Sequence, residues 1–215
     1  MLFDLDGTLA DTAPDLAGAL NQVLRAHGRE TLPLETIRPW ASRGGGAMVK
    51  LGFGIDESHA QFAALRDEFL ARYREGIAVR TALFPGIGEL LSRLEAERYR
   101  WGVVTNKIAR LTEPLLQALE LRARAACVVS GDSAARPKPH ADPLLLACTL
   151  LNCQPAQIVY VGDDRRDVEA GRGAGTATVV ARYGYLQAAD RPDEWGADQV
   201  IDHPLELLPW LAQAG

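Results

Sequence analysis

The 215-residue sequence has few cysteines, no excess of positive charge and no long hydrophobic run. Its three cysteines, Cys127, Cys148 and Cys153, lack CxxC spacing and lie among apolar neighbours, so we expect buried free thiols and neither a disulfide nor a zinc site. The net charge of -5 argues against binding to nucleic acid or to an anionic membrane surface. No stretch approaches the roughly 20 apolar residues that cross a bilayer, and no charged-then-apolar leader opens the chain, so we expect a cytoplasmic protein.

The composition is that of an ordinary globular protein. It contains 47% hydrophobic and 24% charged residues, which excludes disordered and collagen-like chains. The length suits either one large domain or a core with a smaller insert.

Residues 14–80 have a helical pattern, because apolar residues recur at spacings of three and four, as in Leu16, Leu20 and Val23. No segment of this stretch indicates a strand with confidence. We expect an all-helical unit of about four helices.

From residue 85 onward, short apolar runs alternate with amphipathic segments, a pattern typical of a parallel βαβ sheet. The predicted strands are 101–105, 126–130, 158–161 and 176–181, and the predicted helices lie near 86–98, 108–120, 140–152 and 165–173. Residues 1–5 also form a predicted strand, which we place in the same sheet. The predicted fold class is therefore α/β, a Rossmann-like doubly wound parallel sheet formed by residues 1–13 and 81–215, with residues 14–80 inserted as a helical cap through linkers near 10–13 and 81–85.

Polar side chains follow the predicted strands at their carboxyl ends, where open α/β sheets bind their ligands. Asp4 and Asp6 lie at the carboxyl end of the first predicted strand. Because side chains along a strand alternate between its two faces, residues two apart point the same way. Taken alone, the run Asp4-Leu5-Asp6-Gly7-Thr8 is equally consistent with a solvated turn. Later strands end in Thr105-Asn106 and in Gly162-Asp163-Asp164, with Asp167 one turn farther on.

Carboxylates that meet at one edge of a sheet repel each other unless a cation neutralises them. Ligand sets made only of oxygen suit a hard ion, so the sequence predicts Mg²⁺ as cofactor. Lys138 lies between two prolines, which hold its segment extended, and it could supply positive charge opposite the carboxylates. A solvated loop lysine is the alternative for this position.

Four motifs, in this order, resemble those of the haloacid dehalogenase-like phosphohydrolase superfamily. They are Asp4-Leu5-Asp6-Gly7-Thr8, Val103-Val104-Thr105-Asn106, Lys138-Pro139 and Gly162-Asp163-Asp164-Arg165-Arg166-Asp167. The resemblance covers nearly the whole chain and implies a Mg²⁺-dependent phosphomonoester hydrolase that acts through an aspartyl phosphate.

The resemblance also implies roles for individual residues. Asp4 would be the nucleophile and Asp6 the general acid and base, and an intact Asp6 favours phosphoryl transfer over dehalogenation. Mg²⁺ would be held by Asp4, Asp163 and the backbone carbonyl of Asp6. The remaining predicted residues bind the phosphoryl group or orient the metal from a distance: Thr105, Asn106 and Lys138 for the first role, Asp164 and Asp167 for the second.

The cap of such proteins chooses the substrate. Arg43 and Gly44 lie in the run Ser42 to Met48 at a predicted helix start and are candidates for binding a substrate carboxylate or hydroxyl, although a flexible linker is the alternative. Within the superfamily the chain resembles the phosphoglycolate phosphatase group, and segments 101–107, 161–167, 182–185 and 195–198 resemble N-acetylmuramic acid 6-phosphate phosphatases. The expected substrate is therefore a small sugar phosphate or phospho-acid.

Two other functions stay open at this point, a phosphomutase of the same superfamily and a non-catalytic binding protein. We expect a monomer or homodimer. Only three residues precede Asp4, fewer than this resemblance implies, so we also expect a first strand that is shortened at the cost of stability.

Overall fold

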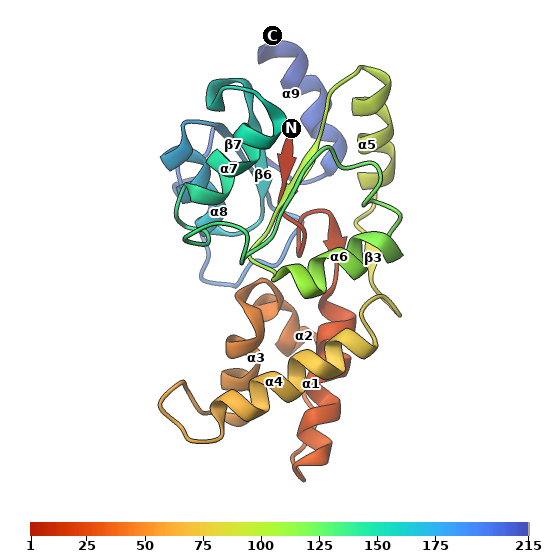
Figure 1. The fold of residues 1–215 in the computed structure, drawn as a ribbon, viewed down its shortest axis with the longest axis vertical. Coiled ribbons are helices and arrows are strands. Elements are labelled where there is room, and N and C mark those ends of the chain that lie inside the picture. Colours follow the sequence, from red (N-terminus) through yellow and green to blue (C-terminus); the bar gives the residue numbers. More distant parts are fainter. Residues whose placement is uncertain (215) are drawn as a thin grey trace.

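The computed structural model describes residues 1–214 and contains a six-stranded sheet with helices on both faces (Figure 1). The strand order is β5-β4-β1-β6-β7-β8, and every neighbouring pair is parallel. The strands are β1 (Leu2–Phe3), β4 (Gly102–Val104), β5 (Val128–Val129), β6 (Val159–Gly162), β7 (Ala177–Ala181) and β8 (Gln199–Ile201). This arrangement confirms the predicted α/β fold class.

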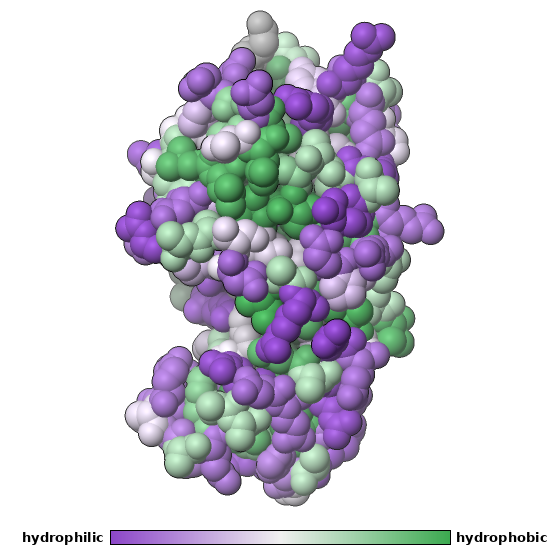
Figure 2. All heavy atoms as spheres, in the orientation of Figure 1, coloured by the Kyte–Doolittle hydropathy of each residue, from purple (hydrophilic) through white to green (hydrophobic). Residues whose placement is uncertain are grey.

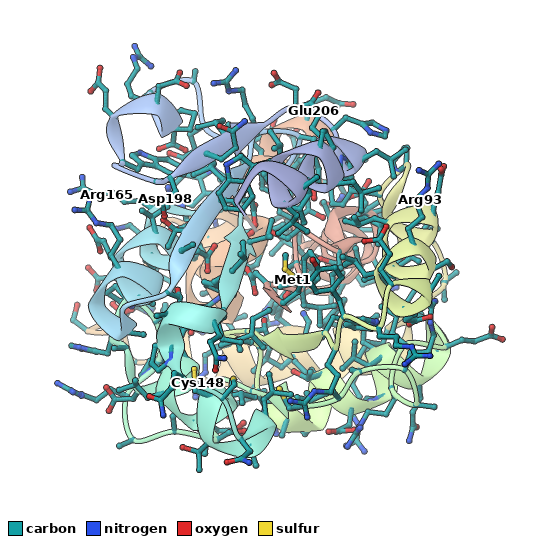
Figure 3. The ribbon with its side chains drawn as sticks, turned by 90° about the horizontal axis from the view of Figure 1, so that it is seen from above. Met1, Arg93, Cys148, Arg165, Asp198 and Glu206 are labelled. Atoms are coloured by element: carbon teal, nitrogen blue, oxygen red, sulfur yellow. The ribbon has the colours of Figure 1, made fainter. Side chains whose placement is uncertain are left out.

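The central strand β1 shows why the sheet is covered twice. Phe3 packs into the apolar cluster formed with α5 (Ile87–Ala96), α6 (Ala109–Ala118) and α9 (Leu207–Ala214). Its neighbour Leu2 packs into the opposite cluster with α7 (Asp142–Leu151) and α8 (Arg165–Ala174). Successive side chains of a strand point to opposite faces, so an apolar pair buries both. From above, Met1 lies between α5, which carries Arg93, and α7, which carries Cys148 (Figure 3).

The helical segment forms a separate apolar cluster at one end of the molecule (Figure 1). It contains α1 (Ala13–Ala26), α2 (Leu34–Ile37), a 3₁₀ helix (Arg38–Arg43), α3 (Gly44–Phe53) and α4 (Phe62–Glu75). Leu20 of α1 and Phe69 of α4 are fully or almost fully buried there. The molecule narrows where this segment meets the sheet (Figure 2). We propose that residues 14–80 form the cap.

The two connections between sheet and cap are not plain linkers. They pair as a short antiparallel ribbon of β2 (Ala10–Asp11) and β3 (Ala82–Leu83), in which Ala10 faces Leu83. The last strand β8 and helix α9 were also absent from the sequence prediction. β8 was missed because it is short and begins with a polar residue, Gln199.

The cysteines form no disulfide within the described part of the chain. Cys127 and Cys148 are buried free thiols, as predicted, whereas Cys153 is half-buried. Burial raises the pKa of Cys127 and of Cys148 to about 11. None of the described helices is long and apolar enough to cross a membrane.

Candidate active site

Asp4 and Asp6 lie directly beyond the carboxyl end of β1. The Asp4 amide donates to the Val161 carbonyl at 2.8 Å and so continues the pairing with β6. The chain then turns at Gly7, whose φ of +86° is a conformation that residues with side chains rarely adopt, and whose amide donates to the Ala10 carbonyl at 3.0 Å. A Cβ at Gly7 would lie 2.1 Å from Oδ2 of Asp163, so glycine is required both for the turn and for the approach of Asp163.

Asp163 follows β6 and is held by several donors. Its Oδ1 accepts a hydrogen bond from the Thr8 hydroxyl at 3.0 Å, and its Oδ2 accepts one from the Tyr185 amide at 2.9 Å. Gly184 allows that loop to come close, because a Cβ there would lie 2.3 Å from the Asp163 Cβ. Asp163 is thereby fixed beside the turn that carries Asp4 and Asp6.

Asp4, Asp163 and Asp167 form a buried acidic cluster, with one oxygen of each within 4.8 Å of the others. Oδ1 of Asp4 is buried, and Nζ of Lys138 is the cation beside it. Burial raises the pKa of Asp4 to about 6, against the opposing charge of Lys138, and burial together with Asp4 raises the pKa of Asp163. Three buried carboxylates crowded together in this way fit a divalent cation. The chemistry of the site is thus that of a metal-binding site built from oxygen ligands.

Lys138 contacts two carboxylates of this cluster and is 4% exposed. Its Nζ is 2.9 Å from Oδ1 of Asp4 and 2.6 Å from Oδ1 of Asp167. It also donates to the Tyr160 hydroxyl at 2.8 Å. Burial alone would lower the pKa of Lys138, but its contacts with Asp167 and Asp4 outweigh burial and raise it. The lysine is therefore a fixed positive charge beside Asp4, where the sequence motif predicted one.

The Thr105 and Asn106 side chains make hydrogen bonds with different parts of the chain. Thr105 is buried, and its hydroxyl accepts a hydrogen bond from the Lys107 amide at 3.2 Å. The Asn106 side chain donates to the Lys138 carbonyl at 2.9 Å and accepts from the Lys138 amide at 3.0 Å. Both ends of this amide side chain are thus engaged in holding the Lys138 segment. The substrate-binding role of Asn106 stays a prediction, and Asn106 also lines the space between cap and sheet.

Asp164 and Asp167, the two carboxylates predicted to orient the metal, also have hydrogen-bond partners within the protein. Asp167 accepts from Lys138, from the Tyr160 hydroxyl at 3.0 Å and from the Asp164 amide at 3.0 Å. Asp164 caps α8 and forms a paired contact with the Arg166 guanidinium, with both distances 2.8 Å. Burial alone would raise the pKa of Asp164, but the Arg166 guanidinium lowers it.

The cap reaches into this site through Ser42. Its hydroxyl lies 3.2 Å from the Asp6 carbonyl and 3.4 Å from Oδ2 of Asp163, which are two of the oxygens predicted to hold a metal. Its carbonyl accepts a hydrogen bond from Arg166 at 3.0 Å. The neighbouring Arg43 is exposed, with its guanidinium 5.5 Å from the centre of the Trp40 ring.

Two connected hollows lie between cap and sheet. The smaller, about 20 Å³, is lined by Asp4, Asp6, Thr105 and Lys138 among others. The larger, about 290 Å³, is lined by apolar residues of the cap and by Arg43 and Gly44. Asp6, Ser42, Asn106, Lys107 and Arg166 line both. We call the smaller one the inner hollow and the larger one the outer hollow. The charged lining of the inner hollow and the apolar lining of the outer one suit a ligand with a compact charged group and a larger organic part.

Several residues of the site were not predicted from the sequence: Thr8, Thr12, Ser42, Lys107, Tyr160, Arg166 and Tyr185. Thr8 and Arg166 lie within quoted motifs, and Lys107 is two residues after Thr105. Their position at strand ends was the available signal. Tyr185 and Ser42 lie in segments that were singled out for other reasons, 182–185 and 42–48, and nothing in those segments predicted their contacts with Asp163.

Comparison with known proteins agrees with this geometry. The sequence pattern of the family described as "Haloacid dehalogenase-like hydrolase" matches residues 1–181. An N-acetylmuramic acid 6-phosphate phosphatase of Pseudomonas putida is 47% identical over 96% of this chain and 93% of its own length. A phosphoglycolate phosphatase of Xanthomonas campestris pv. campestris is 40% identical over 96% of this chain and 93% of its own.

A solved structure, described as a predicted phosphoglycolate phosphatase from Haemophilus somnus, superposes with a TM-score of 0.87 at 27% identity, covering 98% of this chain and 96% of that one. The resemblance stated from the four motifs is confirmed. The chain belongs to the haloacid dehalogenase-like hydrolase family.

Proposed function

We propose that this chain removes the phosphoryl group from N-acetylmuramic acid 6-phosphate, with 2-phosphoglycolate as the next candidate substrate. The chain is a phosphatase of the haloacid dehalogenase-like family. The observation that carries the proposed mechanism is the environment of Asp4, a buried carboxylate beyond β1 whose Oδ1 lies 2.9 Å from Nζ of Lys138. A carboxylate oxygen held in this way is available as a nucleophile.

The first step forms a bond between a carboxylate oxygen of Asp4 and phosphorus while the bond to the leaving oxygen breaks. Asp6 gives its proton to that leaving oxygen. In the second step Asp6 takes a proton from water as the water oxygen attacks phosphorus and frees Asp4. Lys138 and Thr105 line the inner hollow and would bind phosphoryl oxygens through these steps.

We further propose Mg²⁺ as the metal, held by Asp4, Asp163 and the Asp6 carbonyl. When bound, the ion would offset the charge of Asp4 and of a phosphoryl oxygen. Support comes from the oxygen-only donor set and from the burial of Asp4 and Asp163, which raises the pKa of both carboxyl groups. Asp164 and Asp167 would orient these groups through Arg166 and Lys138.

The outer hollow supports the choice of substrate. N-acetylmuramic acid carries a lactyl carboxylate on its sugar ring, and Arg43 and the backbone at Gly44 line the side of the hollow formed by the cap. A volume of about 290 Å³ lies near the lower end of small-molecule sites. The names of two relatives, at 47% and 44% identity, favour the same compound.

The test is phosphate release from a panel of phosphomonoesters with Mg²⁺. N-acetylmuramic acid 6-phosphate should give the highest kcat/KM, and N-acetylglucosamine 6-phosphate, which lacks the lactyl carboxylate, serves as the matched control. We expect Asp4→Asn to abolish turnover and Asp6→Asn to lower kcat by about 10²–10⁴-fold. Arg43→Ala should reduce the ratio of kcat/KM for N-acetylmuramic acid 6-phosphate to kcat/KM for N-acetylglucosamine 6-phosphate. No release from any panel member, or full activity of Asp4→Asn, would contradict the proposal.

A further inference from the structure

The chain contains only three lysines, Lys50, Lys107 and Lys138, among 23 basic residues. Lys50 is exposed on α3, whereas the side chains of Lys107 and Lys138 are buried, at 6% and 3% exposed. A lysine ammonium is a compact charge that a narrow site can enclose, unlike the broad arginine fork. Lys138 already has a role beside Asp4. Lys107 has no role in the steps proposed above.

Lys107 contacts the side chain of Asp6 directly. Its Nζ lies 3.0 Å from Oδ1 of Asp6, and the two side chains are 6% and 9% exposed. The Thr12 hydroxyl donates to the same oxygen at 2.6 Å. No hydrogen bond reaches Oδ2 of Asp6 from any described residue. Two donors therefore hold one oxygen of Asp6 and leave the other available for proton exchange.

The cap completes this arrangement through Tyr73. Nζ of Lys107 lies 4.6 Å from the centre of the Tyr73 ring, within the range of a cation–π contact. Tyr73 belongs to α4 and is 1% exposed. Lys107 is thus enclosed between a carboxylate of the sheet domain and an aromatic ring of the cap.

We propose that Lys107 is a positioning residue for Asp6, and that it aims Oδ2 of Asp6 at the oxygen of the leaving group. The inference rests on the proposed phosphatase reaction, in which Asp6 protonates that oxygen as the P–O bond breaks. Proton transfer requires the donor oxygen to lie within hydrogen-bond reach of the acceptor, and small displacements are costly. Without Lys107, Asp6 would retain its acid group but lose its fixed orientation.

The test compares leaving groups. kcat/KM covers substrate binding and the steps up to release of the leaving group, so it includes the protonation by Asp6 and excludes the later attack of water. An alkoxide must be protonated as it leaves, whereas p-nitrophenolate leaves without a proton. For Lys107→Met we expect kcat/KM to fall about 10–100-fold with N-acetylmuramic acid 6-phosphate or 2-phosphoglycolate, and less than about threefold with p-nitrophenyl phosphate.

Control variants separate positioning from folding. Lys50→Met removes an exposed lysine and should leave every kcat/KM unchanged. Lys107→Gln, which keeps a polar side chain, is the second variant at this position. The melting temperatures of Lys107→Met and Lys107→Gln show whether either change affects folding. In an Asp6→Asn background, Lys107→Met should cause no further loss, because a residue that acts through Asp6 has nothing left to orient.

Equal losses on alkyl and aryl substrates, or additive losses in the double variant, would overturn this inference while leaving the proposed function intact. A wild-type enzyme inactive on all three compounds would contradict the proposed function and this inference with it.

Discussion

Gly7 is needed for two features of the site, the backbone turn after Asp6 and the close approach of Asp163. Because its φ is +86° and a Cβ would lie 2.1 Å from Oδ2 of Asp163, Gly7→Ala should both strain the backbone and displace that carboxylate. We expect the free energy of unfolding to fall by about 2–4 kcal/mol and kcat/KM to fall at least about tenfold. Urea unfolding and phosphate release measure the two effects.

Gly28 offers the matched control for this substitution. Its φ is +66°, yet nothing lies within 4 Å of a Cβ built there. Gly28→Ala should therefore cost only about 1 kcal/mol and leave activity unchanged. Equal effects of the two substitutions would show that crowding against Asp163 is unimportant.

The sequence predicts the residues that follow the strands, and it does not predict the residues that support them. Asp4 and Asp163 were found because parallel strands bring their carboxyl ends to one edge, so a short motif places a side chain in the site. Lys138 lies in a loop and was found from its flanking prolines and from the family resemblance. Tyr185 and Ser42 reach Asp163 from 22 and 121 residues away. Contacts of that kind depend on how the cap and the later loops pack, which no local pattern encodes.

Among the elements, the ribbon of β2 and β3 is fastened by Asp15 at the start of α1. This buried carboxylate accepts hydrogen bonds from the Arg80 amide at 2.9 Å, and from the Thr81 amide and hydroxyl, both at 2.8 Å. Asp15→Ala would leave both amides without these acceptors. We expect the free energy of unfolding, measured in urea, to fall by about 2–4 kcal/mol.

Two further variants sharpen the measurement. Asp15→Asn keeps an acceptor oxygen and should lose less than Asp15→Ala. Asp67→Ala removes an exposed carboxylate from α4 and should change stability by less than about 0.5 kcal/mol. An Asp15→Ala protein as stable as Asp67→Ala would refute the fastening role of Asp15.

The elements that were predicted correctly are those whose own residues determine them. β4 and β6 are short runs rich in valine that are buried on both faces, and such runs read as strands before any partner is known. The ribbon of β2 and β3 was read as two linkers, because each strand has only two residues and forms only when the distant partner is present. β8 was missed for a similar reason, since it adds three residues to an edge already formed by β7.

At the scale of the whole molecule, the cap and the sheet meet through the active site itself. Ser42 of the cap contacts Asp6 and Asp163, Arg166 bonds the Ser42 carbonyl, and Tyr73 covers Lys107. Apolar contacts join the same two parts, since Leu111 of α6 and Tyr185 belong to the cluster of the cap. Binding of a metal or phosphoryl group at the acidic cluster therefore affects the contacts that join the cap to the sheet.

Binding of Mg²⁺ should stabilise the whole molecule. The ion would bind a cluster that exists only in the folded chain, so the free energy of unfolding should rise with its concentration, by about 2.7 kcal/mol at 100 times Kd. For a chain of this length that corresponds to a rise in Tm of about 5–10 °C. Thermal unfolding with and without Mg²⁺ measures the rise, with NaCl at equal ionic strength as the control for screening.

Asp163→Asn tests whether the rise comes from the acidic cluster. Removing this carboxylate relieves repulsion with Asp4, so the variant should fold without metal and yet gain little when Mg²⁺ is added. Asp67→Asn, an exposed change on α4, should keep the full rise. The same rise in Asp163→Asn as in wild type would place the ion elsewhere, and no rise in wild type would contradict the proposed metal site, because crowded buried carboxylates gain most from a divalent cation.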